Sequence, residues 1–91
     1  MKIAIRYMAQ LKMAAGLSAE VLEMPSPTPV GQVLAVLAER HSSLGPLLLT
    51  EQGNVQPTLL LFLGDEQITA AQEVPRRDGE VLTLLTPMAG G

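Results

Sequence analysis

The residues best suited to take part in chemistry stand at the end of the chain, which reads Pro87, Met88, Ala89, Gly90 and Gly91. None of them carries a polar side chain, so the only reactive group of this segment is the α-carboxylate of Gly91. Glycine has no Cβ, so Gly90 and Gly91 can pass through a narrow channel and adopt positive φ without steric cost. We expect residues 87–91 to form a flexible tail that presents this carboxylate. The carboxylate of Gly91 is therefore the predicted functional group.

Other reactive side chains are few. The chain has no cysteine, which excludes disulfides, thiolate metal sites and cysteine nucleophiles. The only histidine, His41, stands at the end of a predicted helix, where interaction with the helix dipole accounts for it. Asp65, Glu66, Asp78 and Glu80 fall in predicted turns without a histidine among them, which favours solvated carboxylates over ligands. We predict no metal site and no cofactor bound by this chain.

Length and charge limit the class of protein. Ninety-one residues predict a single domain, residues 1–91. The net charge is −3 and the six basic residues form no stripe, so nucleic acid is not an expected partner. The longest apolar run, Leu59 to Leu63, is too short to span a membrane, and the N-terminus has no signal-peptide pattern. We expect a cytoplasmic protein without membrane association.

The first half of the chain contains two predicted strands and a helix. Residues 2–8 alternate between apolar and polar positions, which indicates a strand. Residues 9–17 are interpreted as a short connection or one helical turn, and residues 19–24 as a second strand that forms a hairpin with the first. Apolar residues at helical spacing then predict a helix over residues 30–41.

The boundaries of this helix follow from its flanking residues. Thr28 is the predicted N-cap and Pro29 the first helical residue, where the missing N–H costs nothing. Val36 lies off the apolar face and is expected to be partly exposed. Residues 42–46 end the helix, because they contain Gly45 followed by proline.

The second half is predicted to hold three strands. Residues 47–57 are interpreted as a loop. Residues 58–63 are apolar on both faces, as a central strand covered on both sides would be. A short strand over residues 66–68 and a single turn over residues 70–74 follow. The terminal strand, residues 81–86, ends at a proline that cannot donate to a sheet.

This order of elements predicts the fold class. One helix among these strands can cover one face of a small mixed sheet. We therefore predict an α+β protein of the β-grasp, ubiquitin-like architecture, with one main helix packed on one face.

A partner-binding surface is predicted from the alternation of the strands. Met8 lies opposite the apolar side chains that are expected under the helix. Val81 and Leu85 are expected to share the face of Met8. Because an apolar sheet face without a helix over it marks a partner site, Met8, Val81 and Leu85 are the predicted partner-binding residues.

Three stretches stand out as motifs: Ile3-Ala-Ile-Arg-Tyr-Met-Ala-Gln10, Val30-Gly-Gln-Val-Leu34, and Asp78-Gly-Glu-Val81 with Leu84-Leu-Thr-Pro87 and the terminal Gly90-Gly91. They resemble a known family, the MoaD/ThiS-type ubiquitin-like sulfur carriers, and most closely the small subunits of molybdopterin synthase. Thr86-Pro87 replaces a common Pro-Pro, and Met8 and Leu85 stand where the family often has aromatic residues. Residues 42–57 match no part of the pattern.

The resemblance implies a two-stage chemistry at Gly91. An E1-like adenylyltransferase of the MoeB/ThiF type would use ATP and Mg²⁺ to form an acyl-adenylate. A persulfide from a sulfur donor protein would then replace AMP and leave a thiocarboxylate. A synthase large subunit of the MoaE type would hold the cofactor precursor that receives the sulfur, so the catalytic side chains would belong to the partners.

Three functions are compatible with the sequence. The first is a sulfur carrier that acts as the small subunit of molybdopterin synthase in molybdenum cofactor biosynthesis. The second is the same carrier chemistry for thiamine or another sulfur-containing metabolite. The third is a ubiquitin-like protein modifier or a plain binding module. The length and the Leu-rich terminal strand favour the first.

Overall fold

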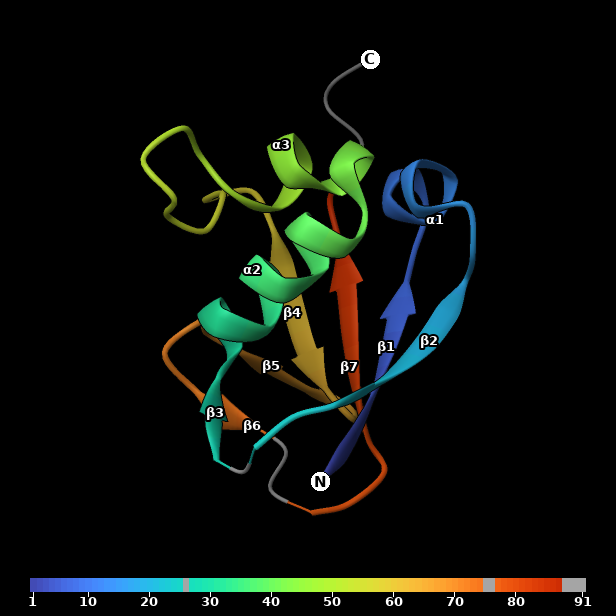
Figure 1. Ribbon diagram of the computed structural model, residues 1–91, viewed down its shortest axis with the longest axis vertical. Helices are drawn as coiled ribbons and strands as arrows, with labels where there is room; N and C mark the ends of the chain where they lie inside the picture. Colours follow the sequence, from blue (N-terminus) through green and yellow to red (C-terminus); the bar gives the residue numbers. More distant parts are fainter. Residues whose placement is uncertain (26, 75–76, 88–91) are drawn as a thin grey trace.

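The computed structural model describes residues 1–25, 27–74 and 77–87. A five-stranded mixed sheet, in the order β2-β1-β7-β4-β5, carries the main helix α2 on one face (Figure 1). The elements are β1 (Lys2–Tyr7), α1 (Gln10–Ala15), β2 (Ala19–Glu23), β3 (Thr28–Pro29), α2 (Val30–Arg40), η1 (Ser42–Leu44), α3 (Gly45–Leu48), β4 (Leu60–Leu63), β5 (Glu66–Ile68), β6 (Glu73–Val74) and β7 (Glu80–Leu85). The predicted α+β, β-grasp fold is confirmed.

The first and last strands lie side by side in the sheet. β1 forms the predicted antiparallel hairpin with β2 on one side and pairs in parallel with β7 on the other. A parallel pair needs a crossover connection, and α2 lies within it. β7 is therefore the central strand, and it carries the chain to the end of the sheet where α1 and α3 lie (Figure 1).

The core fills the space between the sheet and α2. Alternate residues of β1 and β7 point into it, as do the four buried residues of α2. Their side chains are Ile3, Ile5 and Tyr7 from β1, Val30, Val33, Leu34 and Leu37 from α2, and Leu82 and Leu84 from β7. Because only alternate strand residues enter the core, the others remain on the opposite face of the sheet.

The start of α2 differs from the prediction. Thr28 is not the N-cap; it belongs to β3, and its hydroxyl donates a hydrogen bond to the carbonyl of Pro25. Pro29 holds the N-cap position with an extended backbone. The first amides of the helix donate instead to the carbonyls of Gln72 and Ala70, at 2.9 and 3.1 Å. A backbone segment that is distant in the sequence thus replaces a side-chain cap.

Three predictions for the second half are corrected by the structure. The interpreted loop 47–57 begins inside α3 and is closed by an isolated bridge between Leu49 and Val55. Residues 70–74 end in the strand β6, which pairs with β3, rather than in a single turn. β4 is not covered on both sides: its burial alternates, because α2 lies on one face only.

No helix in the described ranges of the chain has both the length and the apolar character needed to cross a membrane.

Candidate functional site

The predicted tail begins where β7 ends. Thr86 follows the strand and is buried, and its hydroxyl has no hydrogen-bond partner among the described residues. Pro87 comes next and is exposed. The strand stops before this proline, as its missing N–H requires.

The other predicted tail residues, Met88, Ala89, Gly90 and Gly91, lie outside the described residues. β7 delivers the chain to the end of the molecule that holds α1 and α3 (Figure 1). The role of Gly91 as the reactive end stays a prediction.

The three predicted partner-binding residues share one face of the sheet. In β7, Leu82 and Leu84 are fully buried, whereas Val81 and Leu85 alternate to the opposite side. Met8 follows β1, and its amide donates to the carbonyl of Leu84 at 3.1 Å. Met8 and Val81 are 37% and 38% exposed. Met8, Val81 and Leu85 therefore lie on the side of the sheet away from the helix, and their role in partner binding stays a prediction.

We call this side of the sheet the open face, because α2 lies on the other side. It is largely apolar in β1, β4 and β7. Its residues are Lys2, Ala4, Arg6, Met8, Leu60, Phe62, Val81, Thr83 and Leu85. The cross-strand pairs Val81–Ala4, Thr83–Phe62 and Leu85–Leu60 make it continuous from β1 to β4.

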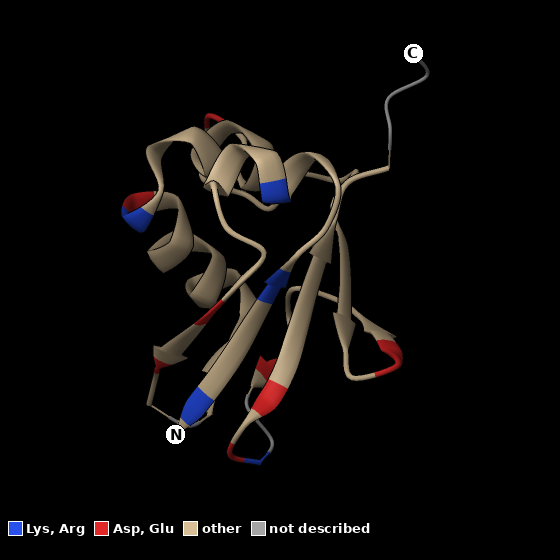
Figure 2. Cartoon of the chain, turned by 90° about the vertical axis from the view of Figure 1, so that its right-hand side faces the viewer, with Lys and Arg blue, Asp and Glu red and all other residues tan. Residues whose placement is uncertain are grey.

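A groove of about 620 Å³ runs along β1, between β2, β7 and the start of α1. Met8, Ala19 and Val81 line its apolar part, and its two charged lining residues are Arg6 and Lys12. Figure 2 shows the basic positions along β1 and on α1, whereas acidic positions mark the starts of β7 and β5. The groove is thus cationic although the chain carries a net charge of −3.

Sequence reasoning missed several residues of this surface. Leu60 and Phe62 belong to it, but the apolar run of residues 58–63 concealed their alternation with the buried Leu61 and Leu63. Arg6 lies on the same side of β1 as Met8, two residues further along, but the sequence reasoning did not connect it with a site. Arg6 could have been found from the alternation of its strand, whereas Leu60 and Phe62 could be assigned only once the structure showed which face of β4 is buried.

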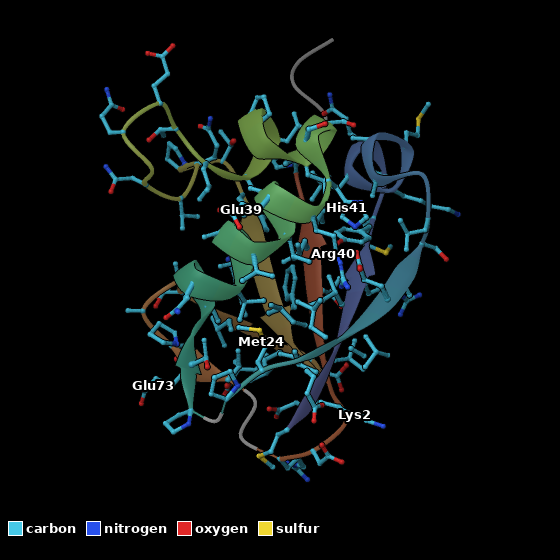
Figure 3. The ribbon with its side chains drawn as sticks, in the orientation of Figure 1. Lys2, Met24, Glu39, Arg40, His41 and Glu73 are labelled. Carbon is cyan, nitrogen blue, oxygen red and sulfur yellow. The ribbon has the colours of Figure 1, made fainter. Side chains whose placement is uncertain are left out.

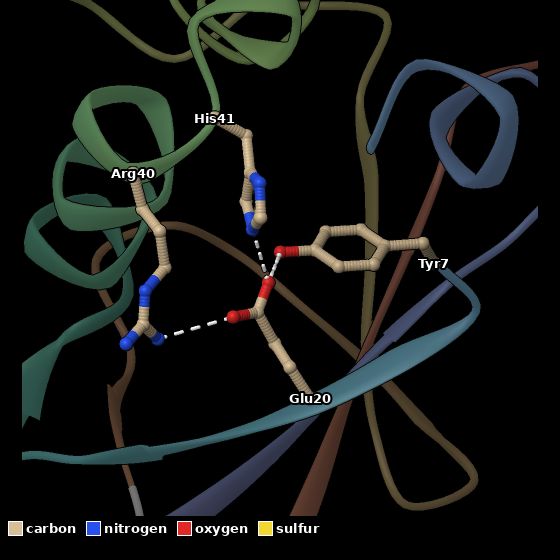
Figure 4. Close-up of polar contacts among 4 residues, drawn as sticks. All are labelled: Tyr7, Glu20, Arg40 and His41. Atoms are coloured by element: carbon tan, nitrogen blue, oxygen red, sulfur yellow. Dashed lines mark hydrogen bonds and ion pairs between the residues drawn. The ribbon is translucent and has the colours of Figure 1, made fainter. Parts of the chain in front are cut away.

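Apart from the groove, a cluster of polar side chains lies on the helix side of the sheet (Figure 4). Glu20 of β2 accepts hydrogen bonds at one oxygen, Oε2, from the hydroxyl of Tyr7 and from Nε2 of His41, each at 2.6 Å. Its other oxygen, Oε1, pairs with the guanidinium of Arg40 at 3.0 Å. Figure 3 shows Arg40 and His41 at the end of α2, beside the β1–β2 hairpin. His41 is therefore held by a carboxylate and not only by the helix dipole.

Electrostatics within this cluster favour an ionised Glu20. Burial would raise the pKa of Glu20, but the hydrogen bonds from Tyr7 and His41 and the nearby positive charge outweigh it and hold this pKa below its usual value. Burial, followed by the hydrogen bond to Glu20 and its charge, raises the pKa of the Tyr7 phenol far above its usual value. Because an ionised carboxylate only accepts hydrogen bonds, His41 carries a proton on Nε2.

The two polar features therefore differ in what they can do. Each group of the Glu20 cluster has a partner inside the molecule, so the cluster connects α2 to the hairpin. The open face combines exposed apolar side chains with the cation Arg6, and Lys12 of α1 adds a second cation to the groove, a composition that suits contact with another protein. Within the described ranges, no three His, Cys, Asp or Glu side chains come together as a metal site.

Comparison with known families gives one match. The model of the ThiS family matches residues 5–91 of the chain. No curated protein matches this chain.

Solved structures share the fold over nearly the whole chain. SAMP1 from Haloferax volcanii is 20% identical, and the match covers 100% of both chains with a TM-score of 0.88. A Pyrococcus furiosus protein described as a putative molybdopterin converting factor, subunit 1, is 19% identical over 97% of this chain and 99% of that chain, with a TM-score of 0.76. A chain of the Amycolatopsis orientalis BexX/CysO complex is 22% identical over 98% and 99%, with a TM-score of 0.70. At these identities the likeness establishes the fold.

Proposed function

Because this chain belongs to the ThiS family of ubiquitin-like sulfur carriers, we propose that Gly91 carries sulfur and donates it as part of a molybdopterin synthase, whose small subunit this chain forms. The observation that supports the carrier role best is that the family match extends to Gly91 itself. The β-grasp fold and the central position of β7, the strand that leads to the tail, agree with it.

The proposed chemistry begins at the Gly91 carboxylate, which is a poor acyl donor because its leaving group would be oxide. An E1-like activating enzyme, which uses ATP with Mg²⁺, transfers the AMP group of ATP to this carboxylate and releases pyrophosphate. A persulfide sulfur of a donor protein then attacks the acyl carbon and expels AMP. A thiol cleaves the resulting S–S bond, which leaves the thiocarboxylate on Gly91.

The open face is the proposed docking surface for these partners. Met8, Val81 and Leu85 present apolar area on the side of the sheet away from α2. β7 contributes two of them and also leads into the tail, so a partner that covers the open face lies beside the point where the tail departs. Docking would thereby position the reactive end without a catalytic side chain from this chain.

A protein modifier is the second candidate function. The observation that favours it is the match to SAMP1, a small archaeal modifier protein, which covers both chains completely. In this role the adenylated Gly91 would be attacked by a lysine amine of a target protein, and an amide would form with loss of AMP. Thiamine or another sulfur-containing metabolite is a further possible destination if the product is a thiocarboxylate.

Mass spectrometry separates these functions. The protein is incubated with the E1-like activating enzyme of the same organism, ATP, Mg²⁺, and a cysteine desulfurase with cysteine as sulfur source. The carrier role predicts that one oxygen is replaced by sulfur, and fragmentation should place the change on Gly91. Omission of ATP should prevent it, because the acyl carbon is then not activated.

The acceptor is identified in a second step. Sulfurated protein is mixed with the synthase large subunit and the cofactor precursor, and loss of the sulfur is followed by mass. Sulfur transfer to this precursor would support the molybdopterin role. Amide-linked adducts at Gly91 in lysate without any sulfurated form would support the modifier role instead.

A further inference from the structure

Arg6 is the single charged residue in the middle of the open face. It lies on β1, where Ala19 of β2 and Thr83 of β7 are its cross-strand neighbours. Neither neighbour carries a charge. Among the residues that the structure describes, Arg6 forms no ion pair, and the same holds for Lys12 at the end of the groove. Both side chains are exposed, so water solvates their charges in the isolated protein.

Docking changes this situation. A partner that covers Met8 and Val81 also covers Arg6, since all three line the same groove. The guanidinium would then lose its water. Burial of an unpaired charge is far more costly than burial of apolar area is favourable, so an apolar partner surface would be repelled at this point.

A partner carboxylate removes this penalty. The guanidinium presents a planar set of donors that matches both oxygens of a carboxylate, and the pair strengthens as water is excluded. The groove supplies no carboxylate of its own, because its described lining has two cations and no acidic residue.

We infer that the activating enzyme places an acidic side chain in this groove, opposite Arg6 and within reach of Lys12. This inference rests on the proposed function for the existence of the docking step, and it specifies the chemistry of the partner's surface. Arg6 acts as a specificity-determining residue. A carrier-binding surface with a lysine or an apolar residue at this point is rejected, and one with Asp or Glu is accepted.

The test compares variants of Arg6 that differ in charge and in polarity. Binding of the purified activating enzyme from the same organism is measured by titration calorimetry for the wild type, Arg6→Leu, Arg6→Lys and Arg6→Glu. Lys2→Leu is the matched control: it removes a cation from the same face of β1, at the far end from α1 and outside the groove (Figure 3). Thermal melting of each variant confirms that it is folded.

If the partner presents a carboxylate, Arg6→Leu should weaken binding by about 30-fold or more, because the acid is left buried without a partner. Arg6→Lys should recover part of this loss, and Arg6→Glu should weaken binding further. Lys2→Leu should stay within about threefold of the wild type, as expected for an exposed charge at the rim. Raised salt should weaken the wild-type complex more than that of Arg6→Leu.

Two results would overturn the inference, and they can be distinguished. Equal or tighter binding of Arg6→Leu, with a wild type that binds and supports ATP–pyrophosphate exchange, would show that an apolar surface faces Arg6 and would leave the carrier function intact. A wild type that neither binds nor supports exchange would remove both the docking step and the proposed carrier function.

Discussion

The hydroxyl of Tyr7 donates a 2.6 Å hydrogen bond to Glu20, from the fully buried end of β1 to the edge strand β2. The same carboxylate oxygen accepts a hydrogen bond from Nε2 of His41, which follows α2. One carboxylate thus fastens three elements together: the strand that lies beside β7, its hairpin partner, and the end of the helix. The rings of Tyr7 and His41 are also packed edge to face, with an interplanar angle of 87° and centroids 6.1 Å apart.

Removing this hydroxyl should destabilise the fold. Tyr7→Phe keeps the buried ring but deletes the donor to an ionised acceptor, which lowers the free energy of unfolding by about 2 kcal/mol. Urea unfolding at neutral pH measures the change. Val21→Ala, on the exposed side of β2, serves as a control for a mild change in the same hairpin. A Tyr7→Phe protein as stable as the wild type would contradict the role of the cluster.

Stability should also fall in acid through Glu20. Its pKa is lower in the folded protein than in the unfolded chain, where a glutamate has a pKa of about 4.3, so the unfolded state binds more protons in acid. The stabilisation is complete above the unfolded pKa and is lost as the pH falls through the folded pKa. Urea unfolding from about pH 6 down to about pH 3 should show a shallower loss for Glu20→Gln than for the wild type. Glu39→Gln, at an exposed position of α2, is the matched control for the effect of the substitution itself.

A third prediction concerns the turn that connects β1 to α1. Ala9 has φ 51° and ψ −123°, close to the first central position of a type II′ turn, and Leu11 donates to the carbonyl of Met8 across it. An L-residue is strained there, whereas glycine is not. Ala9→Gly should therefore raise the free energy of unfolding by about 1 kcal/mol.

The matched control is Ala35→Gly, at an exposed position inside α2, where the same substitution should lower stability by about 1 kcal/mol. Opposite signs for the two variants in one urea titration series would establish the strain at Ala9. A loss of stability at both positions would exclude it.

Much of the fold and the candidate site follows from local periodicity. Alternation in β1 and β7 placed Met8 and Leu85 on one face, because a strand residue can only point to one side or the other. The helix was found from its 3.6-residue apolar repeat. Both patterns involve residues that are only a few positions apart in the sequence, so the sequence alone reveals them.

The parts that sequence reasoning missed depend on distant contacts. Thr28 has the residue type of an N-cap, but the carbonyls of Ala70 and Gln72, distant in the sequence, accept the hydrogen bonds of the first helical amides in its place. β3 and β6 have two residues each, too few to show alternation. Glu20 and His41 are ordinary polar residues in the sequence, and only the fold makes them partners.

The docking role of the open face is tested with a charge. Leu85 is half-buried on that face, and a carboxylate there stays in water until a partner covers it. Leu85→Glu should weaken binding of the activating enzyme and of the synthase large subunit by about tenfold or more, because docking would bury an unpaired charge. Titration calorimetry gives the affinities, and thermal melting checks the fold.

Ala35→Glu is the control for this variant. It adds the same charge on the exposed surface of α2, on the other side of the sheet, and should leave both affinities unchanged. If Leu85→Glu also binds both partners as the wild type does, the open face is not the docking surface.

The final prediction concerns the tail itself, and its readouts separate fold from function. Deletion of Gly91 removes the proposed acyl donor, and Gly90→Phe adds a bulky side chain to a segment that a narrow channel would accept only as glycine. Both should abolish ATP–pyrophosphate exchange with the activating enzyme. Neither should change the melting temperature, because the core residues of β1, α2 and β7 all lie upstream of Pro87. Gly90→Ala adds a single methyl group and should give an intermediate rate if the limit is steric. Normal exchange by the Gly91 deletion would show that the enzyme activates some other carboxylate, and Gly91 would then lose its proposed role.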